Sequence, residues 1–161
     1  MSLTHEQDID FLRRTLELSI ESKTNGNHPF GAVLVGPDGE TLVESGNTFQ
    51  TDKGLGHAEA NVARIAAKAF EWDFLSKCTL YSSIEPCCMC TGSAYWAGIG
   101  SIVFGVSEKE LGNLTGDHPE NLTMDLPCEV VVAAGSRDIT VKGPCQELES
   151  EILNVHIGFW N

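Results

Sequence analysis

Two short stretches of the sequence carry side chains that could hold a metal ion. Cys87 and Cys90 are three positions apart directly after Pro86, and His57 lies about one strand and one helix earlier. In the first turn of a helix, residues three apart share one face, and the helix N-terminus favours the thiolate form that binds metals. Three protein ligands leave the fourth tetrahedral position of a zinc ion open, as in catalytic sites. We therefore predict one catalytic Zn²⁺ per chain, held by His57, Cys87 and Cys90.

Glu59 is predicted to move protons at this site. It lies two residues after His57, so both side chains can turn toward the metal only if a helix begins between them. Zinc lowers the pKa of bound water from roughly 15.7 to about 7. Glu59 would take the proton of that water, deliver it to a ring nitrogen and later protonate departing ammonia. The combined pattern, His-x-Glu followed by Pro-Cys-x-x-Cys, is the signature of zinc deaminases that act on nucleobases.

Simpler interpretations exist for each half of the pattern. A lone His-x-Glu is usually a surface or capping pair, and a lone Cys-x-x-Cys is often structural, but a structural zinc ribbon needs a fourth ligand from a second pair. The isolated Cys78, Cys128 and Cys145 are interpreted as buried apolar residues. Cys88 breaks the three-residue spacing to Cys90, so we predict that it packs beside the site.

Composition narrows the class of partner. The 161 residues carry 10 Lys and Arg against 23 Asp and Glu, a net charge of −13 with no local basic patch, which disfavours nucleic acid and favours a small uncharged ligand. Apolar runs are too short for a membrane span. The polar, acidic N-terminus lacks the features of a signal peptide, so we expect a cytoplasmic protein. The length predicts a single domain over 1–161.

Periodicity and turn residues predict an α/β fold. Helices are expected at 6–22, 58–70 and 86–97, with Asn25-Gly26-Asn27 ending the first and Gly98 the third, and a final helix is expected to carry one apolar stripe, namely Leu148, Ile152, Val155 and Phe159. Strands are expected at 30–35, 41–44, 79–84, 101–106 and 129–133, with a loop at 112–126. This order predicts a mixed five-stranded sheet covered by helices on both faces.

The chain resembles the cytidine deaminase superfamily over about residues 30–106. The stretch Thr-Leu-Tyr-Ser-Ser-Ile-Glu-Pro-Cys-Cys-Met-Cys-Thr-Gly-Ser-Ala at 79–94 is similar to bacterial guanine deaminases, tRNA adenosine deaminases and fungal cytosine deaminases. Pro-Phe-Gly-Ala-Val at 29–33 and Tyr-Trp-Ala at 95–97 resemble the guanine deaminase branch most closely. The resemblance implies a three-layer α/β/α cytidine deaminase-like fold, a homodimer and a guanine-type base as substrate.

The resemblance also implies substrate-binding residues. Asn47 matches the asparagine whose amide offers a donor and an acceptor to a base edge, although Gly46-Asn47 alone would be interpreted as a turn. Phe30, Ala58 and the backbone carbonyl of Ser83 are expected at the substrate, with the alternative that Phe30 is only the first core residue of its strand.

Two further residues come from segments that are less similar to the family. Asp117, after Gly116, loosely resembles an acidic residue that assists proton transfer in guanine deaminases, with loop solvation as the alternative. Trp160 belongs to a C-terminal segment that resembles the family's lid over the pocket. It is expected to pack on the active site or on a partner subunit.

Three functions compete at this stage. The first is a free-base deaminase, with guanine or a related aminopurine or aminotriazine ahead of cytosine and nucleosides. The second is a tRNA adenosine deaminase with the same chemistry, which needs a basic surface that this sequence lacks. The third is a catalytically silent module that zinc only stabilises.

Overall fold

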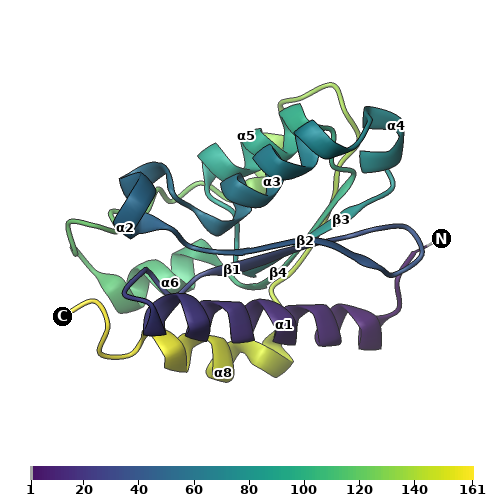
Figure 1. The fold of residues 1–161 in the computed structure, drawn as a ribbon. Helices are drawn as coiled ribbons and strands as arrows, with labels where there is room; N and C mark the ends of the chain where they lie inside the picture. Colours follow the sequence, from purple (N-terminus) through teal and green to yellow (C-terminus); the bar gives the residue numbers. More distant parts are fainter. Residues whose placement is uncertain (1) are drawn as a thin grey trace.

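The computed structural model describes residues 2–161, in which a sheet lies between two layers of helices (Figure 1). Met1, the first residue of the predicted domain 1–161, lies outside the described residues. The sheet has the strand order β2-β1-β3-β4-β5. Its strands are β1 (Gly31–Val35), β2 (Thr41–Gly46), β3 (Thr79–Ile84), β4 (Ser101–Val106) and β5 (Thr140–Lys142).

Strand directions confirm the predicted mixed sheet. β1 pairs antiparallel with β2 and β3, whereas β3, β4 and β5 are parallel to one another. Parallel neighbours need a crossover connection, and α5 (Cys88–Ala97) supplies it between β3 and β4. Gly98 ends α5 in the left-handed conformation, with φ of 96°, as the sequence predicts.

The two helical layers cover opposite faces of the sheet. α1 (His5–Thr24) and α8 (Gln146–His156) pack on one face, and α3 (Ala58–Ala69) packs beside α5 on the other (Figure 1). α1 begins with a capping box, in which Thr4 and Gln7 exchange hydrogen bonds, and it ends at Asn25. The three-layer α/β/α architecture is thereby confirmed.

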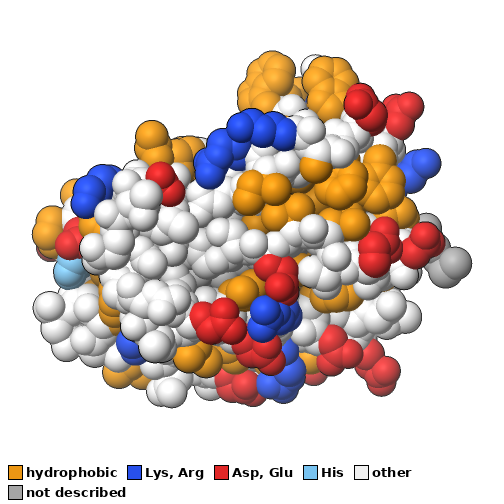
Figure 2. Space-filling model, viewed as in Figure 1, with side chains coloured by type: hydrophobic (Ala, Val, Ile, Leu, Met, Phe, Trp, Pro, Cys, Tyr) orange, Lys and Arg blue, Asp and Glu red, His pale blue; other side chains and the backbone are white. Residues whose placement is uncertain are grey.

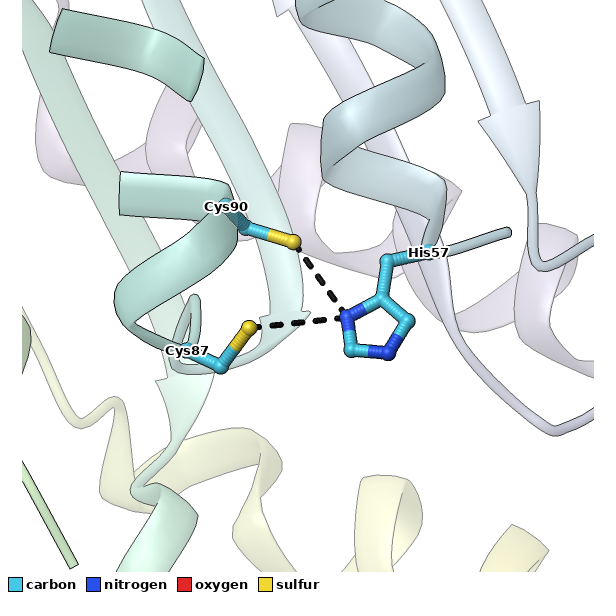
Figure 3. Close-up of side chains that lie close together, drawn as sticks. All are labelled: His57, Cys87 and Cys90. Carbon is cyan, nitrogen blue, oxygen red and sulfur yellow. Dashed lines mark hydrogen bonds between the residues drawn. The ribbon is translucent and has the colours of Figure 1, made fainter. Parts of the chain in front are cut away.

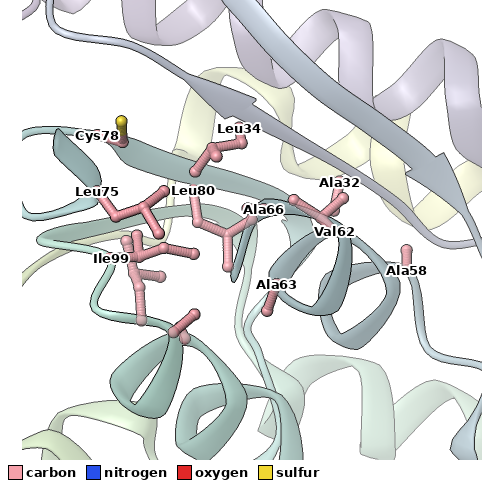
Figure 4. Packing of buried hydrophobic residues seen from close by; sticks show 13 residues of the cluster. Ala32, Leu34, Ala58, Val62, Ala63, Ala66, Leu75, Cys78, Leu80 and Ile99 are labelled. Carbon is pink, nitrogen blue, oxygen red and sulfur yellow. The ribbon is translucent and has the colours of Figure 1, made fainter. Parts of the chain in front are cut away.

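Strand β1 contributes side chains to two separate cores. Ala32 and Leu34 point to the cluster under α3 and α5, which Figure 4 shows from close by. Val33 and Val35 point to the cluster under α1 and α8. Alternating side chains of one strand face opposite sides of a sheet, so a strand buried on both faces is apolar throughout.

The prediction of a strand at 129–133 is wrong. This segment is the helix α7 (Cys128–Ala133), and the fifth strand is β5, further along the chain. Only Cys128 and Val132 of α7 are buried, a spacing of one helical turn. A short apolar run does not by itself distinguish strand from helix.

The predicted loop at 112–126 is partly helical, because α6 (Glu108–Thr115) occupies its first residues. Ser107 caps α6 by accepting a hydrogen bond from the backbone N–H of Glu110. Ser107 followed three residues later by Glu110 is a pattern typical of a helix start, so the sequence does contain a signal for α6. The final helix is confirmed in part, since it ends at His156 and Phe159 lies beyond it.

Short helices complete the fold: α2 (Phe49–Asp52), the 3₁₀ helix η1 (Lys53–Leu55) and α4 (Trp72–Leu75). Within residues 2–161, none of the helices combines the length and the apolar character needed to cross a membrane.

Candidate active site

His57, Cys87 and Cys90 converge from the N-termini of two neighbouring helices (Figure 3). His57 is the N-cap of α3, and Cys87 is the N-cap of α5, with Cys90 in its first turn. Nδ1 of His57 lies 3.5 Å from Sγ of Cys87 and 3.4 Å from Sγ of Cys90. Because α3 and α5 pack side by side, the two helix starts bring these side chains together.

The arrangement fits a tetrahedral zinc ion. Zn–S bonds of about 2.3 Å and Zn–N bonds of about 2.0 Å, at a tetrahedral angle, separate nitrogen and sulfur by about 3.5 Å. The three ligand atoms all lie within 4.8 Å of one another. Hydrogen bonds from Cys90 and His57 lower the pKa of Cys87 to about 4, against the effect of burial, so the thiolate is available at neutral pH. In residues 2–161 this is the one such cluster of possible ligands.

Glu59 lies beside this cluster and outside the set of ligands. It stands in the first turn of α3 with its side chain only 5% exposed. Burial raises the pKa of Glu59 to about 7, against the opposing effect of the nearby His57. A buried carboxyl whose pKa lies near neutrality can both accept and release a proton at working pH.

A narrow pocket opens onto this cluster, with a cavity volume of about 30 Å³. Its walls come from the chain before β1, the start of α3, the end of β3, α6 and the loop after α6. The lining residues are His28, Phe30, His57, Glu59, Ile84, Glu85, Cys87, Glu108, Leu111, Asn121 and Thr123. Three of these are acidic, and no Lys or Arg of the described chain is among them.

The predicted substrate-binding residues lie at different depths. Phe30 lines the pocket. Ala58 is buried as the first residue of α3. Asn47 is buried, and its Oδ1 accepts hydrogen bonds from the backbone N–H groups of His28, at 3.3 Å, and Phe49, at 2.8 Å. The bond to His28, together with the bond from the backbone N–H of Asn47 to the carbonyl of Phe30, holds Asn47 next to two residues that line the pocket.

Of the predicted substrate-binding residues only Phe30 lines the pocket, and the predicted proton shuttle Asp117 does not line it either. Ser83 is fully buried in β3, where its Oγ accepts a hydrogen bond from the backbone N–H of Gly31. Asp117 is exposed and follows Gly116, which has φ of 58°. Cys88 is half-buried, with its Sγ 3.3 Å from Sδ of Met124, so it packs beside the site as predicted.

The C-terminal aromatics pack on their own chain. Trp160 is 7% exposed, and its Nε1 donates a hydrogen bond of 3.1 Å to Nδ1 of His156. Its ring meets the rings of His28 and His118 edge-on, at centroid distances of 4.8 Å and 5.2 Å. Since His28 also lines the pocket, the segment after α8 supports a pocket wall of the same subunit.

Sequence reasoning missed five polar residues of the pocket. Three of them, His28, Glu85 and Glu108, are buried. Glu85 accepts hydrogen bonds from the backbone N–H groups of Glu108, at 3.0 Å, and Cys128, at 2.9 Å, so it holds the starts of α6 and α7. The other two, Asn121 and Thr123, lie on the loop after α6.

Glu108 is 8% exposed, and burial, followed by the charges of Cys87 and Glu85, raises its pKa to about 8. The capping pattern at Ser107 is the signal that could have placed Glu108 at a helix start, directly after the carboxyl end of the parallel strand β4. Ligands of α/β folds bind at the carboxyl ends of parallel strands.

Residues 5–106 match the family described as the cytidine and deoxycytidylate deaminase zinc-binding region. The chain belongs to this family, and the resemblance found in the sequence is confirmed. It is an enzyme, a zinc-dependent hydrolase that acts on C–N bonds, and the hypothesis of a catalytically silent module is set aside.

Several relatives span much of the chain. A protein of Schizosaccharomyces pombe named probable cytosine deaminase is 33% identical over 156 residues, which cover 97% of this chain and 94% of that protein. The guanine deaminase of Bacillus subtilis is 42% identical over 89 residues, which cover 54% of this chain and 56% of that protein. A tRNA-specific adenosine deaminase of Haemophilus influenzae is 31% identical over 144 residues, covering 84% and 82% of the two chains.

Solved structures share the fold. A guanine deaminase from Nitrosomonas europaea superposes with a TM-score of 0.70 at 22% identity, over 96% of this chain and 84% of that chain. Relatives of different substrate class thus share the metal-binding region.

Proposed function

We propose that this enzyme deaminates a free nucleobase by hydrolysis, with a guanine-type base as the first candidate. The observation that carries the proposal is a buried Glu59 next to the His57, Cys87 and Cys90 cluster, at the end of a narrow pocket. Hydrolysis adds water to the ring carbon that bears the amino group, and the C–N bond then breaks to release ammonia. The ring keeps the oxygen of the water as a carbonyl.

The catalytic roles follow from position. His57, Cys87 and Cys90 would hold the zinc ion, which supplies the Lewis acidity that activates water near neutral pH. Glu59 takes one proton from the attacking water and gives it to the ring nitrogen beside the attacked carbon. It then passes the second proton of the water to the departing amino group, so that neutral ammonia leaves.

Substrate-binding roles are proposed for five residues. Phe30 stacks against the ring from the pocket wall, and Asn47 offers its side-chain amide N–H to a base edge. Ala58 lends its backbone N–H at the start of α3, and Ser83 its backbone carbonyl near the leaving ammonia. Trp160 holds His28 in place from behind, through the edge-on contact of the two rings.

The charge of the chain favours a base or nucleoside over a nucleotide or tRNA. The chain as a whole carries −13, which repels phosphate, and no Lys or Arg of the described residues lines the pocket to offset it. The relative from Haemophilus influenzae keeps tRNA adenosine deamination as an alternative to test. A nucleic acid would need a basic surface near the pocket, and no Lys or Arg lines it within the described residues.

Two relatives point to different bases. The guanine-type assignment is supported by the 42% identity to the Bacillus subtilis guanine deaminase over 89 residues. Cytosine is the second candidate, because the probable cytosine deaminase from Schizosaccharomyces pombe matches nearly the whole chain.

The test is a screen for ammonia release over guanine, guanosine, cytosine, cytidine, adenine and aminotriazines, with inosine formation in tRNA measured in parallel. We expect turnover of guanine or a related free base and none of tRNA. Glu59→Gln should lower kcat by about 10²- to 10⁴-fold while about one zinc per chain is retained. Glu71→Gln, at an exposed position after α3, is the control and should behave as the parent enzyme. Normal turnover by Glu59→Gln would refute the mechanism.

We also propose that the enzyme is a homodimer. Large apolar side chains lie exposed on the helical layer of α3, α4 and α5, among them Ile65, Trp72 and Trp96, and Figure 2 shows hydrophobic side chains gathered over this side. Exposed apolar patches of this kind mark interaction surfaces. Light scattering should give twice the 17.4 kDa of one chain. Trp96→Glu should reduce the mass to that of a monomer, whereas a parent enzyme that is monomeric would contradict the proposal.

A further inference from the structure

Glu108 brings a buried carboxyl into the pocket from outside the metal-binding region. It is the first residue of α6, directly after β4 and Ser107. It lines the same pocket as His57 and Glu59. The family match ends at residue 106, so Glu108 lies in the part of the chain where relatives need not agree.

The position of Glu108 is fixed by its backbone. Its N–H donates to Oε1 of Glu85 at 3.0 Å, and Oε2 of Glu85 accepts from the start of α7. Ser107 caps the same helix through Glu110. The backbone of Glu108 is therefore held beside the pocket by bonds that do not use its carboxyl.

The carboxyl has no protein partner at its buried end. Among the buried side-chain nitrogen and oxygen atoms of residues 2–161, Oε2 of Glu108 is the one without a hydrogen bond. Leaving such an atom unpaired is unfavourable, and buried acceptors of native proteins normally have a partner. Both oxygens of the neighbouring Glu85 accept backbone hydrogen bonds, and no Lys or Arg of residues 2–161 lines the pocket.

We propose that Glu108 determines substrate specificity by accepting a hydrogen bond at Oε2 from an N–H group on the edge of the substrate ring. The inference rests on the proposed function and names what the pocket selects, namely a base that has a free ring or amino N–H at this edge. A base that carries a methyl group on that nitrogen would lose the bond and leave Oε2 unpaired. Sites built to bind an N–H reject analogues without it more strongly than apolar pockets reject a methyl group.

The test compares Glu108→Ala and Glu108→Gln with Glu110→Gln, a matched control at an exposed position of the same helix. Steady-state kinetics would be measured on the best base of the screen and on its N-methyl derivatives. We expect the parent to prefer the unmethylated base over one of the derivatives by about 10- to 100-fold, the value of a hydrogen bond to a charged or buried partner. Glu108→Ala should reduce this preference to within about 3-fold, mainly through KM. Glu108→Gln keeps one acceptor oxygen, so its preference for the unmethylated base should lie between those of the parent and Glu108→Ala.

Binding without turnover supplies a second readout. In a Glu59→Gln background, the Kd of the unmethylated base, measured by calorimetry, should rise by about 10- to 100-fold on Glu108→Ala. Zinc content should stay at about one per chain. The thermal midpoint should stay the same or rise, because removing an unpaired buried acid does not remove a stabilising contact. A structural role would instead lower the thermal midpoint.

The outcomes separate the two proposals. If the parent deaminates a base, Glu59→Gln is inactive, and Glu108→Ala keeps the parent's KM and preference, then the inference on Glu108 is wrong and the proposed function stands. If the parent neither binds nor deaminates any base, both are wrong. A loss of preference in Glu110→Gln equal to that in Glu108→Ala would also overturn the inference.

Discussion

Residues 31–106 and the residues after 106 contribute to the pocket in different ways. The first region supplies the cluster of His57, Cys87 and Cys90, and it does so at the starts of two helices that pack on one sheet face. The second region supplies Glu108, Asn121 and Thr123 from a helix and a loop at the edge of the sheet. The first therefore provides the parts that any deamination needs. The second provides parts that can differ between substrates.

The family match ends where the second region begins. It spans residues 5–106, and relatives named for cytosine, guanine and tRNA adenosine are all similar to this chain. Loops and short helices tolerate change better than a buried sheet, so substrate choice can vary there without loss of the fold. The comparison predicts that substitutions before and after residue 106 will affect different measurements.

The largest effect is expected for a zinc ligand in the first region. Cys87→Ser should reduce bound zinc from about one per chain to below about 0.1 and abolish turnover, because a hydroxyl is a much poorer ligand than a thiolate. Metal content by mass spectrometry checks this. Cys88→Ser, one residue away, should keep zinc and activity, since Cys88 packs against Met124 and lies outside the cluster. Equal zinc loss in both variants would show that the ligand assignment is wrong.

A smaller and different effect is expected in the second region at Trp160. Trp160→Ala should raise KM by about 10-fold, or about 1.4 kcal/mol, and leave zinc content unchanged, because the indole supports His28 in the pocket wall. Kinetics and metal analysis on the same preparation check both parts. Ile157→Ala, at an exposed position of the same segment, is the control. A fall in zinc content with Trp160→Ala would contradict the division between the regions.

The C-terminal segment should also respond to pH through His156. Burial lowers the pKa of His156 to about 3, whereas the unfolded chain has about 6.5. Between these values the unfolded state binds one more proton, so the free energy of unfolding falls as pH falls, by at most about 1.4 kcal/mol per pH unit. Urea unfolding at pH 7, 6 and 5 measures the slope. In His156→Gln, the free energy of unfolding should depend less on pH than in the parent enzyme, because up to one fewer proton is taken up on unfolding. Identical slopes in the variant and the parent would refute the prediction.

The smallest effect is expected at Asp117. Its side chain is exposed and outside the pocket, so Asp117→Asn should change kcat and KM by less than about 2-fold, as surface substitutions usually do. The ammonia-release assay on the best base checks this. A loss of kcat above about 10-fold, in the range of a lost general acid or base, would show instead that the loop after Gly116 brings Asp117 to the substrate during turnover.

Sequence reasoning succeeded where short-range pattern and tertiary burial agree. The strands at 79–84 and 101–106 and the helix that Gly98 ends were predicted nearly to the residue, because each is bounded by turn residues and packs in the buried cores on the faces of the sheet. After residue 106 it failed for a physical reason. The run Glu-Val-Val-Val-Ala at 129–133 fits strand and helix equally, and the helix is selected by Glu85, which accepts a hydrogen bond from the N–H of Cys128.

The sequence by itself determined which residues are the candidate zinc ligands and which carboxyl stands beside them. The spacing of Cys87 and Cys90 and the place of Glu59 after His57 are local, and a helix start converts each spacing into geometry. The packing of α3 beside α5 then brings the two helix starts together. Only the tertiary structure decided that Glu108, Asn121 and His28 meet at one pocket, and that Trp160 supports it from behind. These residues are far apart in the sequence, and packing alone brings them together. That packing also leaves Oε2 of Glu108 unpaired.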